Sequence, residues 1–241
     1  MTHITRSAAG LLATVALLSA APLSAYASTS APFLGAAAKF VVLGGAGVTC
    51  TKSTVGLGAV GSKLTVTKTA TCSIAGAVHA GDATAMTAFN AFSTAYTALK
   101  AKTCPSANNL TGQALGGKTL APGVYCFNTT AGLTSGTLTL AGPSSGVWVF
   151  QVGTGLTTGT AQVVMAGGGV ACNVYWALGT LGTIGTGSKF KGNILAGSGV
   201  SFTGTSSSMV GRALAKTSVT MTGTNLRLPS NWNTSTCGRT P

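Results

Sequence analysis

Hydrophobic and polar residues alternate in short runs over most of the chain, and toward the C-terminus the alternation repeats. In blocks of nineteen, the stretch from Cys172 to Leu228 gives CNVYWALGTLGTIGTGSKF, KGNILAGSGVSFTGTSSSM and VGRALAKTSVTMTGTNLRL. The blocks lack runs long enough for a helix, and their Thr, Val, Ile and Gly favour short strands and tight turns. A fixed short period predicts a β-solenoid with one coil per block. The blocks align Gly192 with Gly211, Ala177 with Ala196 and Ala215, Val200 with Val219, and Thr186 with Thr205 and Thr224.

Strand alternation divides the side chains of these blocks into an inward and an outward set. In the second and third blocks, Phe202 and Met221 alternate with hydroxyl residues. In the first block, Ile184 lies on the same side as Thr186 and Ser188, and Thr183 lies on the opposite side. Bulky apolar residues favour the inside, so the hydroxyls should form a flat outward grid, with coils ~4.8 Å apart and alternate residues ~6.6 Å apart. The grid is expected to contain Thr186, Ser188, Ser201, Thr203, Thr205, Ser207, Thr220, Thr222 and Thr224.

Two earlier segments extend this pattern. VWVFQVGTGLTTGT, residues 147–160, resembles the first block, and it adds Thr158 and Thr160 to the expected grid. Residues 161–169 then have the character of an insertion. KLTVTKTATC, residues 63–72, alternates Thr with other residues, and two interpretations stay open for it: a further Thr-bearing strand, or an ordinary edge strand whose polar side is solvated.

One segment changes to a helical period. Between Asp82 and Lys102, apolar side chains recur at steps of three and four residues, with alanines between them. Asp82 is placed to cap the N-terminus, and Cys104-Pro105 ends the pattern. The sequence therefore predicts one α-helix over about 82–102, packed along the flank of the solenoid. A helix cap for Asp82 and a nearby loop position for His79 explain these two residues better than catalytic roles do.

The first residues have the pattern of an export signal. Residues 1–27 contain Arg6, an apolar run and the small-x-small site Ala25-Tyr26-Ala27, which is typical of a cleavable signal peptide. No later segment predicts a membrane span. We therefore expect a secreted protein in which residues 28–241 form a single β domain, with its regular coils at about 172–228.

The charge inventory excludes most hydrolytic chemistry. The chain has 14 Lys and Arg, one acidic residue and two histidines. Beyond the signal peptide the acid is Asp82 and the histidine is His79, so paired carboxylates and zinc or calcium ligand sets are lacking. We expect no enzyme activity, no cofactor and no metal. The basic residues are scattered singly without interleaved aromatics, which favours solubility over nucleic-acid binding.

Six cysteines in an exported chain predict disulfides rather than metal or redox sites, because CxxC pairs are absent. Fifteen pairings are possible. Sequence order suggests Cys50 with Cys72, Cys104 with Cys126, and Cys172 with Cys237.

Several segments carry a family resemblance. LGAAAKFVVLGGAGVT (34–49), LGGKTLAPGVYCF (115–127), VFQVGTGLTT (149–158), and FKGNILA with VGRALA (190–196 and 210–215), together with the Ala-rich helix, resemble the microbial ice-binding protein family. The resemblance implies a mainly β fold, an irregular, discontinuous β-solenoid with one long α-helix packed alongside. It also implies an exported protein, expected to be a monomer, whose partner is an ice surface with its ordered water, and which inhibits ice growth and recrystallisation.

The resemblance also bears on the hydroxyl grid. Active members often show a T-A/G-x-T/N pattern; Thr222-Gly223-Thr224-Asn225 fits it, whereas Thr186-Gly187-Ser188-Lys189 ends in a charged residue. Two other interpretations stay open. The Thr-rich strands could be ordinary solvated strands. Alternatively, the protein could be a cell-surface or extracellular-matrix protein that binds polysaccharide through its basic surface.

Overall fold

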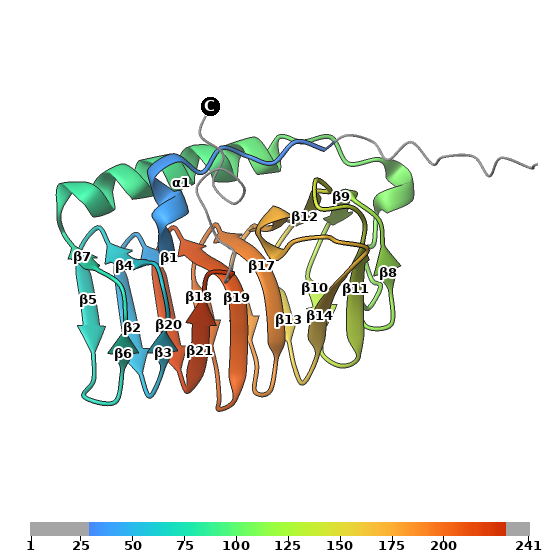
Figure 1. The fold of residues 1–241 in the computed structure, drawn as a ribbon. Helices are drawn as coiled ribbons and strands as arrows, with labels where there is room; N and C mark the ends of the chain where they lie inside the picture. Colours follow the sequence, from blue (N-terminus) through green and yellow to red (C-terminus); the bar gives the residue numbers. More distant parts are fainter. Residues whose placement is uncertain (1–28, 230–241) are drawn as a thin grey trace, which may run out of the picture.

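The chain folds into a three-sided β-solenoid with one long helix lying along it (Figure 1). The computed structural model describes residues 29–229. All strand pairs are parallel, as expected for coils stacked on one another. The expected fold class, a mainly β discontinuous solenoid with one flanking helix, is confirmed. The signal peptide expected at residues 1–27 lies outside the described residues.

Two sheets form the three sides of the solenoid, because one of them, with 14 strands, covers two sides. The first, which we call the threonine face, is a seven-stranded sheet with the order β10 (Ala131–Leu133), β13 (Leu156–Thr158), β16 (Gly182–Ile184), β18 (Val200–Phe202), β20 (Ser218–Thr222), β2 (Gly47–Thr51) and β5 (Thr65–Lys68). The second, which we call the basic face, has the order β8 (Thr119–Leu120), β11 (Thr137–Ala141), β14 (Gln162–Ala166), β17 (Lys189–Ala196), β19 (Ser207–Ala215), β21 (Thr224–Arg227), β3 (Thr54–Val55) and β6 (Ser73–Ile74).

The third side, which we call the helix face, continues from the second because β17 and β19 bend around the corner between them. Its remaining strands are β9 (Gly123–Phe127), β12 (Trp148–Val152), β15 (Val174–Leu178), β1 (Phe40–Gly44), β4 (Ala59–Ser62) and β7 (Val78–Ala80). The bend lies at Gly192 and Gly211, which pair with each other and have φ of 114° and 149°. Only glycine adopts such angles readily, so the aligned glycines of the repeat mark a corner.

The helix connects two separate stacks of coils. Residues 40–80 form the coils at one end, α1 (Ala83–Lys100) then runs the length of the solenoid, and the later coils return until β1 and β2 pair with β19 and β20 (Figure 1). Short 3-10 helices lie at η1 (Gly35–Lys39), η2 (Ser106–Asn108) and η3 (Ala171–Asn173). The first and last coils of the described residues therefore pair with each other inside the solenoid, which is why it is discontinuous.

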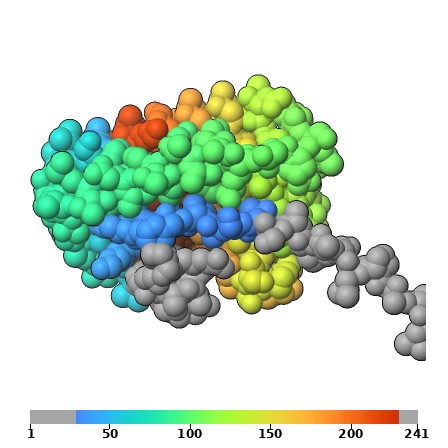
Figure 2. All heavy atoms as spheres, turned by 90° about the horizontal axis from the view of Figure 1, so that it is seen from above, coloured from blue at the N-terminus to red at the C-terminus, as the bar shows by residue number. Residues whose placement is uncertain are grey.

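Two hydrophobic cores hold this arrangement. The first fills the solenoid, where the rings of Tyr125, Phe150, Trp176 and Phe190 stack from coil to coil with centroids 5.5, 3.9 and 5.1 Å apart. The second lies between the helix face and the segments that cover it, and it includes Phe92 and Leu99. Figure 2 shows α1 in green beside the blue N-terminal segment, both lying over that face. The helix face is thereby removed from solvent.

The predicted helix and its cap are confirmed. Asp82 Oδ1 accepts a hydrogen bond from the Ala85 N–H at 2.8 Å, and Asp82 Oδ2 lies 2.8 Å from His79 Nδ1. The Ala85 N–H, with a smaller contribution from His79, holds the pKa of the Asp82 carboxyl below its usual value. Gln151 Nε2 donates to the Leu99 carbonyl at 2.7 Å and fixes the C-terminal end of the helix on the helix face. The only acid of the chain therefore has a structural role.

Two of the three suggested disulfides are confirmed. Cys50 bonds to Cys72, and Cys104 bonds to Cys126, each with a sequence separation of 22 residues. The pairing of Cys172 with Cys237 includes a residue outside the described range, so it stays a prediction. The expected insertion at residues 161–169 is wrong, because β14 pairs in register with β11 over Thr137–Ala141 and continues the basic face.

No helix within residues 29–229 has the length and apolar character needed to cross a membrane.

Candidate functional site

The threonine face carries a straight row of hydroxyl side chains across six of its seven strands. The strand register joins Gly132, the position on β10, to Thr157, Thr183, Ser201, Thr220, Thr49 and Thr67 in succession. Their neighbours along the strands, such as Val48 and Cys50, are buried except on the edge strand β5, so this row points outward. Parallel strands set members of such a row ~4.8 Å apart. The result is a regular row of hydroxyl groups over six strands, five of them on threonines that also present a methyl group.

A second outward row lies two residues further along the strands. Thr51 pairs with Thr222. The Thr69 N–H donates to the Cys50 carbonyl at 3.0 Å, and this hydrogen bond places Thr69 beside Thr51 in the row. Thr203 extends the row because Phe202 pairs with Met221. Toward the other end of the face the corresponding positions are Gly159 and Gly185. The second row therefore carries Thr on only part of the face.

The structure places the expected hydroxyl residues in three different environments. Ser201, Thr203, Thr220 and Thr222 lie on the threonine face as expected. Thr160, Thr186 and Thr205 are exposed but belong to the turns between the threonine and basic faces. The expected outward orientation of Thr158, Ser188, Ser207 and Thr224 is wrong, because these side chains are buried. Sequence reasoning did not assign Thr49, Thr51, Thr157 and Thr183 to the face, and it left a Thr-bearing strand open for the segment with Thr65, Thr67 and Thr69, which the structure places at the edge of this face.

The errors come from steps between coils that are not all nineteen residues. Gly192, Ala196 and Val200 do pair with Gly211, Ala215 and Val219. In the coil before them Ile184 pairs with Phe202, a step of eighteen, so Ile184 is inward and Thr183 outward. Ala177 likewise pairs with Leu195 rather than with Ala196. Because side chains alternate with a period of two, a slip of one residue exchanges the faces.

At the corner after β20 the step between coils is shorter still, and it places the Thr224 side chain inside the solenoid. Thr224 pairs with Ser207, seventeen residues earlier, rather than with Thr205. Its Oγ1 donates to the Ser207 carbonyl at 3.1 Å, while Thr158 Oγ1 donates to Ser188 Oγ at 3.0 Å. These hydroxyls therefore hydrogen-bond inside the corner between the threonine and basic faces. Replacing Thr224 by a large residue would disrupt the fold rather than test a surface.

Ser207 is the exception in this corner, since its buried Oγ has no hydrogen-bond partner among the described residues. A buried hydroxyl without a partner loses its hydration without compensation. Ser207→Ala is therefore expected to raise the free energy of unfolding by about 1 kcal/mol, measured by urea denaturation. The matched control is Thr224→Val, which removes a hydroxyl that does donate and should lower it by about 1 kcal/mol. A clear destabilisation by Ser207→Ala would contradict this account.

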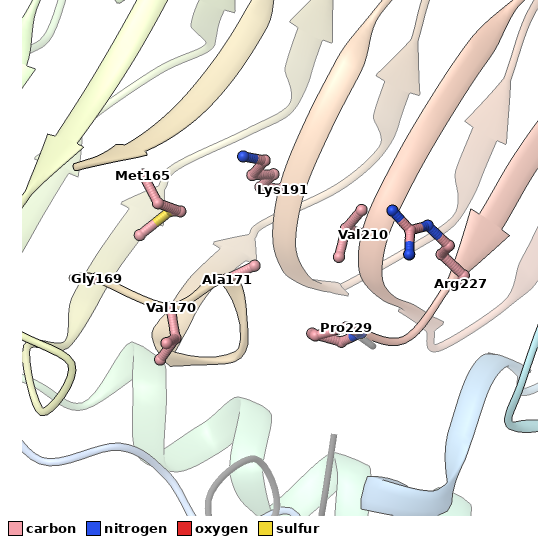
Figure 3. A pocket seen from close by; sticks show the side chains of 8 residues that line it. All are labelled: Met165, Gly169, Val170, Ala171, Lys191, Val210, Arg227 and Pro229. Carbon is pink, nitrogen blue, oxygen red and sulfur yellow. The ribbon is translucent and has the colours of Figure 1, made fainter. Parts of the chain in front are cut away.

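The basic face differs chemically from the threonine face. Lys191 and Arg227 are both register partners of Val210, and both line a hollow of about 310 Å³ (Figure 3). The other lining residues are Met165, Gly169, Val170, Ala171 and Pro229. Among the described residues the lining contains no acid, histidine, thiol or hydroxyl. It offers positive charge over an apolar floor, but no group for general acid-base or nucleophilic catalysis.

The described residues offer few ligands for a metal ion. Within residues 29–229 no cluster of three or more His, Cys, Asp or Glu side chains is placed to hold an ion. Asp82 is engaged in capping α1, and His79 is its hydrogen-bond partner. The extended surface with a repeated chemistry is the threonine face.

Comparison with known proteins agrees with the fold. The profile of the family described as ice-binding-like matches residues 32–227. An ice-binding protein of Nostoc sp. (strain HG1) is 38% identical over 209 residues, covering 84% of this chain and 75% of that protein. Ice-binding protein K1-A of Typhula ishikariensis is 34% identical over 208 residues, covering 77% of this chain and 84% of its own.

Solved structures give the same result. An ice-binding protein from an Antarctic biological consortium superposes with a TM-score of 0.80 at 31% identity, covering 85% of this chain and 94% of that one. The ice-binding protein of the Antarctic ascomycete Antarctomyces psychrotrophicus superposes with a TM-score of 0.78 at 31% identity, covering 84% and 100%. These comparisons give no support to the alternative of a polysaccharide-binding surface or matrix protein.

Proposed function

The chain belongs to the ice-binding-like family, and from this premise we propose that the protein adsorbs to ice through its threonine face and so inhibits ice growth and recrystallisation. The observation that carries the choice of face is the unbroken outward row from Thr157 to Thr67. None of the other described surfaces repeats one small amphiphilic side chain from coil to coil over most of its length.

Threonine suits this role because it combines two groups on a short side chain. Its methyl group presents apolar surface, and its hydroxyl anchors a water molecule. Threonines held on a rigid sheet can order a layer of water that merges with the crystal, and a rigid surface has little entropy to lose on adsorption. β-Branched side chains are also restricted at χ1, which keeps the row regular. Serine, as at Ser201, supplies only the hydroxyl.

The threonine face is also nearly free of charge. Among its seven strands the only charged residue is Lys68, at the end of the edge strand β5. Lys68 is exposed at the sheet edge, but it pairs with Cys50, whose side chain points inward, so it is not in register with the outward threonines. The basic face instead exposes Lys189 and Arg227. Strongly hydrated cations interrupt an ordered water layer, which favours the threonine face for ice.

Three further parts of the proposal concern the whole protein. Adsorption to ice requires no catalytic group, and we propose that the protein is not an enzyme. The export pattern of residues 1–27 supports a secreted protein. A single solenoid side presents the complete hydroxyl rows, so one copy suffices for binding and we propose a monomer.

The test is thermal hysteresis, with observation of crystal shape and an ice-recrystallisation assay, on the purified and oxidised protein. A gap between melting and freezing with shaped crystals, or inhibited recrystallisation at micromolar concentration, is the expected result. Absence of both in a folded sample would overturn the proposal. Binding to immobilised acidic glycans under the same conditions would then direct attention to the basic face.

A further inference from the structure

We propose that ice adsorption is concentrated in one half of the threonine face, in a paired threonine array on β20, β2 and β5. This inference rests on the proposed function of that face. The array consists of two threonines from each of three adjacent strand segments, namely Thr220 and Thr222, Thr49 and Thr51, and Thr67 of β5 with Thr69, which directly follows that strand.

The register makes this array a rectangle. Thr49 pairs with both Thr220 and Thr67, while Thr51 pairs with Thr222. Five of the six threonines are exposed and Thr51 is half-buried. Their spacing is ~4.8 Å between strands and ~6.6 Å along a strand. Six methyl groups and six hydroxyls therefore repeat in two directions, whereas a single row repeats in one.

Two strands in the other half of the face, β13 and β16, cannot contribute to a second threonine row. A Cβ atom at Gly159 would lie 2.2 Å from the Thr134 carbonyl oxygen, and one at Gly185 would lie 2.4 Å from the Thr158 carbonyl oxygen. Any side chain at these two positions would clash with the backbone of the preceding coil. Strands β13 and β16 are thus limited to one outward threonine each, Thr157 and Thr183. The division of the face follows from backbone packing as well as from residue choice.

A disulfide lies directly behind the array. Cys50 follows Thr49 and precedes Thr51 on β2, with its side chain buried, and it bonds to Cys72 just beyond Thr69. Strand β5 is the edge of the sheet and pairs only with β2. An edge strand held on one side is prone to local opening. The Cys50–Cys72 bond therefore keeps the outer third of the array in register.

The first experiment compares two double variants that each remove two threonines. Thr49→Ala/Thr51→Ala changes the array, and Thr157→Ala/Thr183→Ala changes the other half of the face. The concentration needed for a given recrystallisation inhibition should rise roughly tenfold for the array pair, the factor expected for two lost methyl contacts. For the other pair the rise should be smaller, roughly threefold, because Thr157 and Thr183 belong to the single outward row and have no second row beside them.

The outcomes separate this inference from the proposed function. Equal losses in the two double variants would overturn the array and leave ice binding by the threonine face in place. Unchanged activity in both, with activity present in the parent, would overturn the choice of face. Circular dichroism on each variant establishes that any loss occurs in the folded state.

The second experiment tests the disulfide with a matched control. Cys50→Ala/Cys72→Ala and Cys104→Ala/Cys126→Ala each open a loop of the same sequence separation, 22 residues, so the loss of chain constraint is similar. Only the first lies behind the array, whereas the second links the segment after α1 to β9. Measured where both variants are folded, thermal hysteresis should fall for the first and be retained for the second. Equal retention would overturn the role of the disulfide.

Discussion

Thr220→Tyr should abolish most of the thermal hysteresis while the protein stays folded. Thr220 is exposed near the middle of the threonine face, between Ser201 and Thr49 in the outward row. A tyrosine ring there rises well above the neighbouring threonines and holds a flat crystal surface away from them. Tyrosine is a good strand residue, so the sheet tolerates it. The concentration for half-maximal recrystallisation inhibition should increase by roughly tenfold or more, which corresponds to about 1.4 kcal/mol of lost adsorption energy.

Thr54→Tyr is the matched control on another side of the solenoid. Thr54 is exposed on β3 of the basic face, and its register partners are Asn225 and Ser73. The same increase in side-chain size should leave ice activity unchanged there. If Thr54→Tyr were inactive and Thr220→Tyr fully active, the basic face would be the ice-binding surface and the proposal for the threonine face would fail.

The local elements of this fold could be predicted from the sequence. The helix could be predicted because its apolar residues follow a helical period and Asp82 supplies the cap. The solenoid could be predicted because Gly192 and Gly211 recur at the same position of the repeat, which is a corner in the structure. Two disulfides follow sequence order because each closes a short loop of the chain, Cys50–Cys72 at one end of the solenoid and Cys104–Cys126 at the other. These features depend on residues close together in the chain.

The composition of the threonine face could not be predicted in the same way. Four of the six threonines of the paired array come from the segments of β2 and β5, which join β20 only after α1 has reversed the course of the chain. No local pattern specifies that Val42 pairs with Ala213. The alternation of Thr in residues 63–72 was visible, but its position beside Thr49 was not. Which hydroxyls point outward also depends on coil steps of seventeen, eighteen or nineteen residues, and each odd slip reverses the assignment.

Substitution of Arg212 should cause a large loss of stability. This residue is buried at the corner where β19 enters the helix face. Its Nε and Nη2 donate to the Ala38 carbonyl at 3.1 and 2.7 Å, and its Nη1 donates to Asn193 Oδ1 at 2.8 Å. Asn193 in turn donates to the Cys172 and Val174 carbonyls. Desolvation lowers the pKa of Arg212 to about 10, so the side chain stays charged at neutral pH. The guanidinium thus ties η1 to the strands of the corner.

Arg212→Met keeps most of the side-chain volume and removes these donors. It leaves the Ala38 carbonyl and Asn193 Oδ1 buried with fewer donors, at a cost of about 1–3 kcal/mol for each acceptor left unpaired. We therefore expect the free energy of unfolding in guanidinium chloride to fall by roughly 3 kcal/mol. Ice activity should persist wherever the variant is folded, because the corner lies away from the threonine face. Arg227→Met, which removes an exposed arginine, should change stability by no more than about 0.5 kcal/mol. A similarly small change in Arg212→Met would mean that the cost of burying its charge cancels the hydrogen bonds it makes.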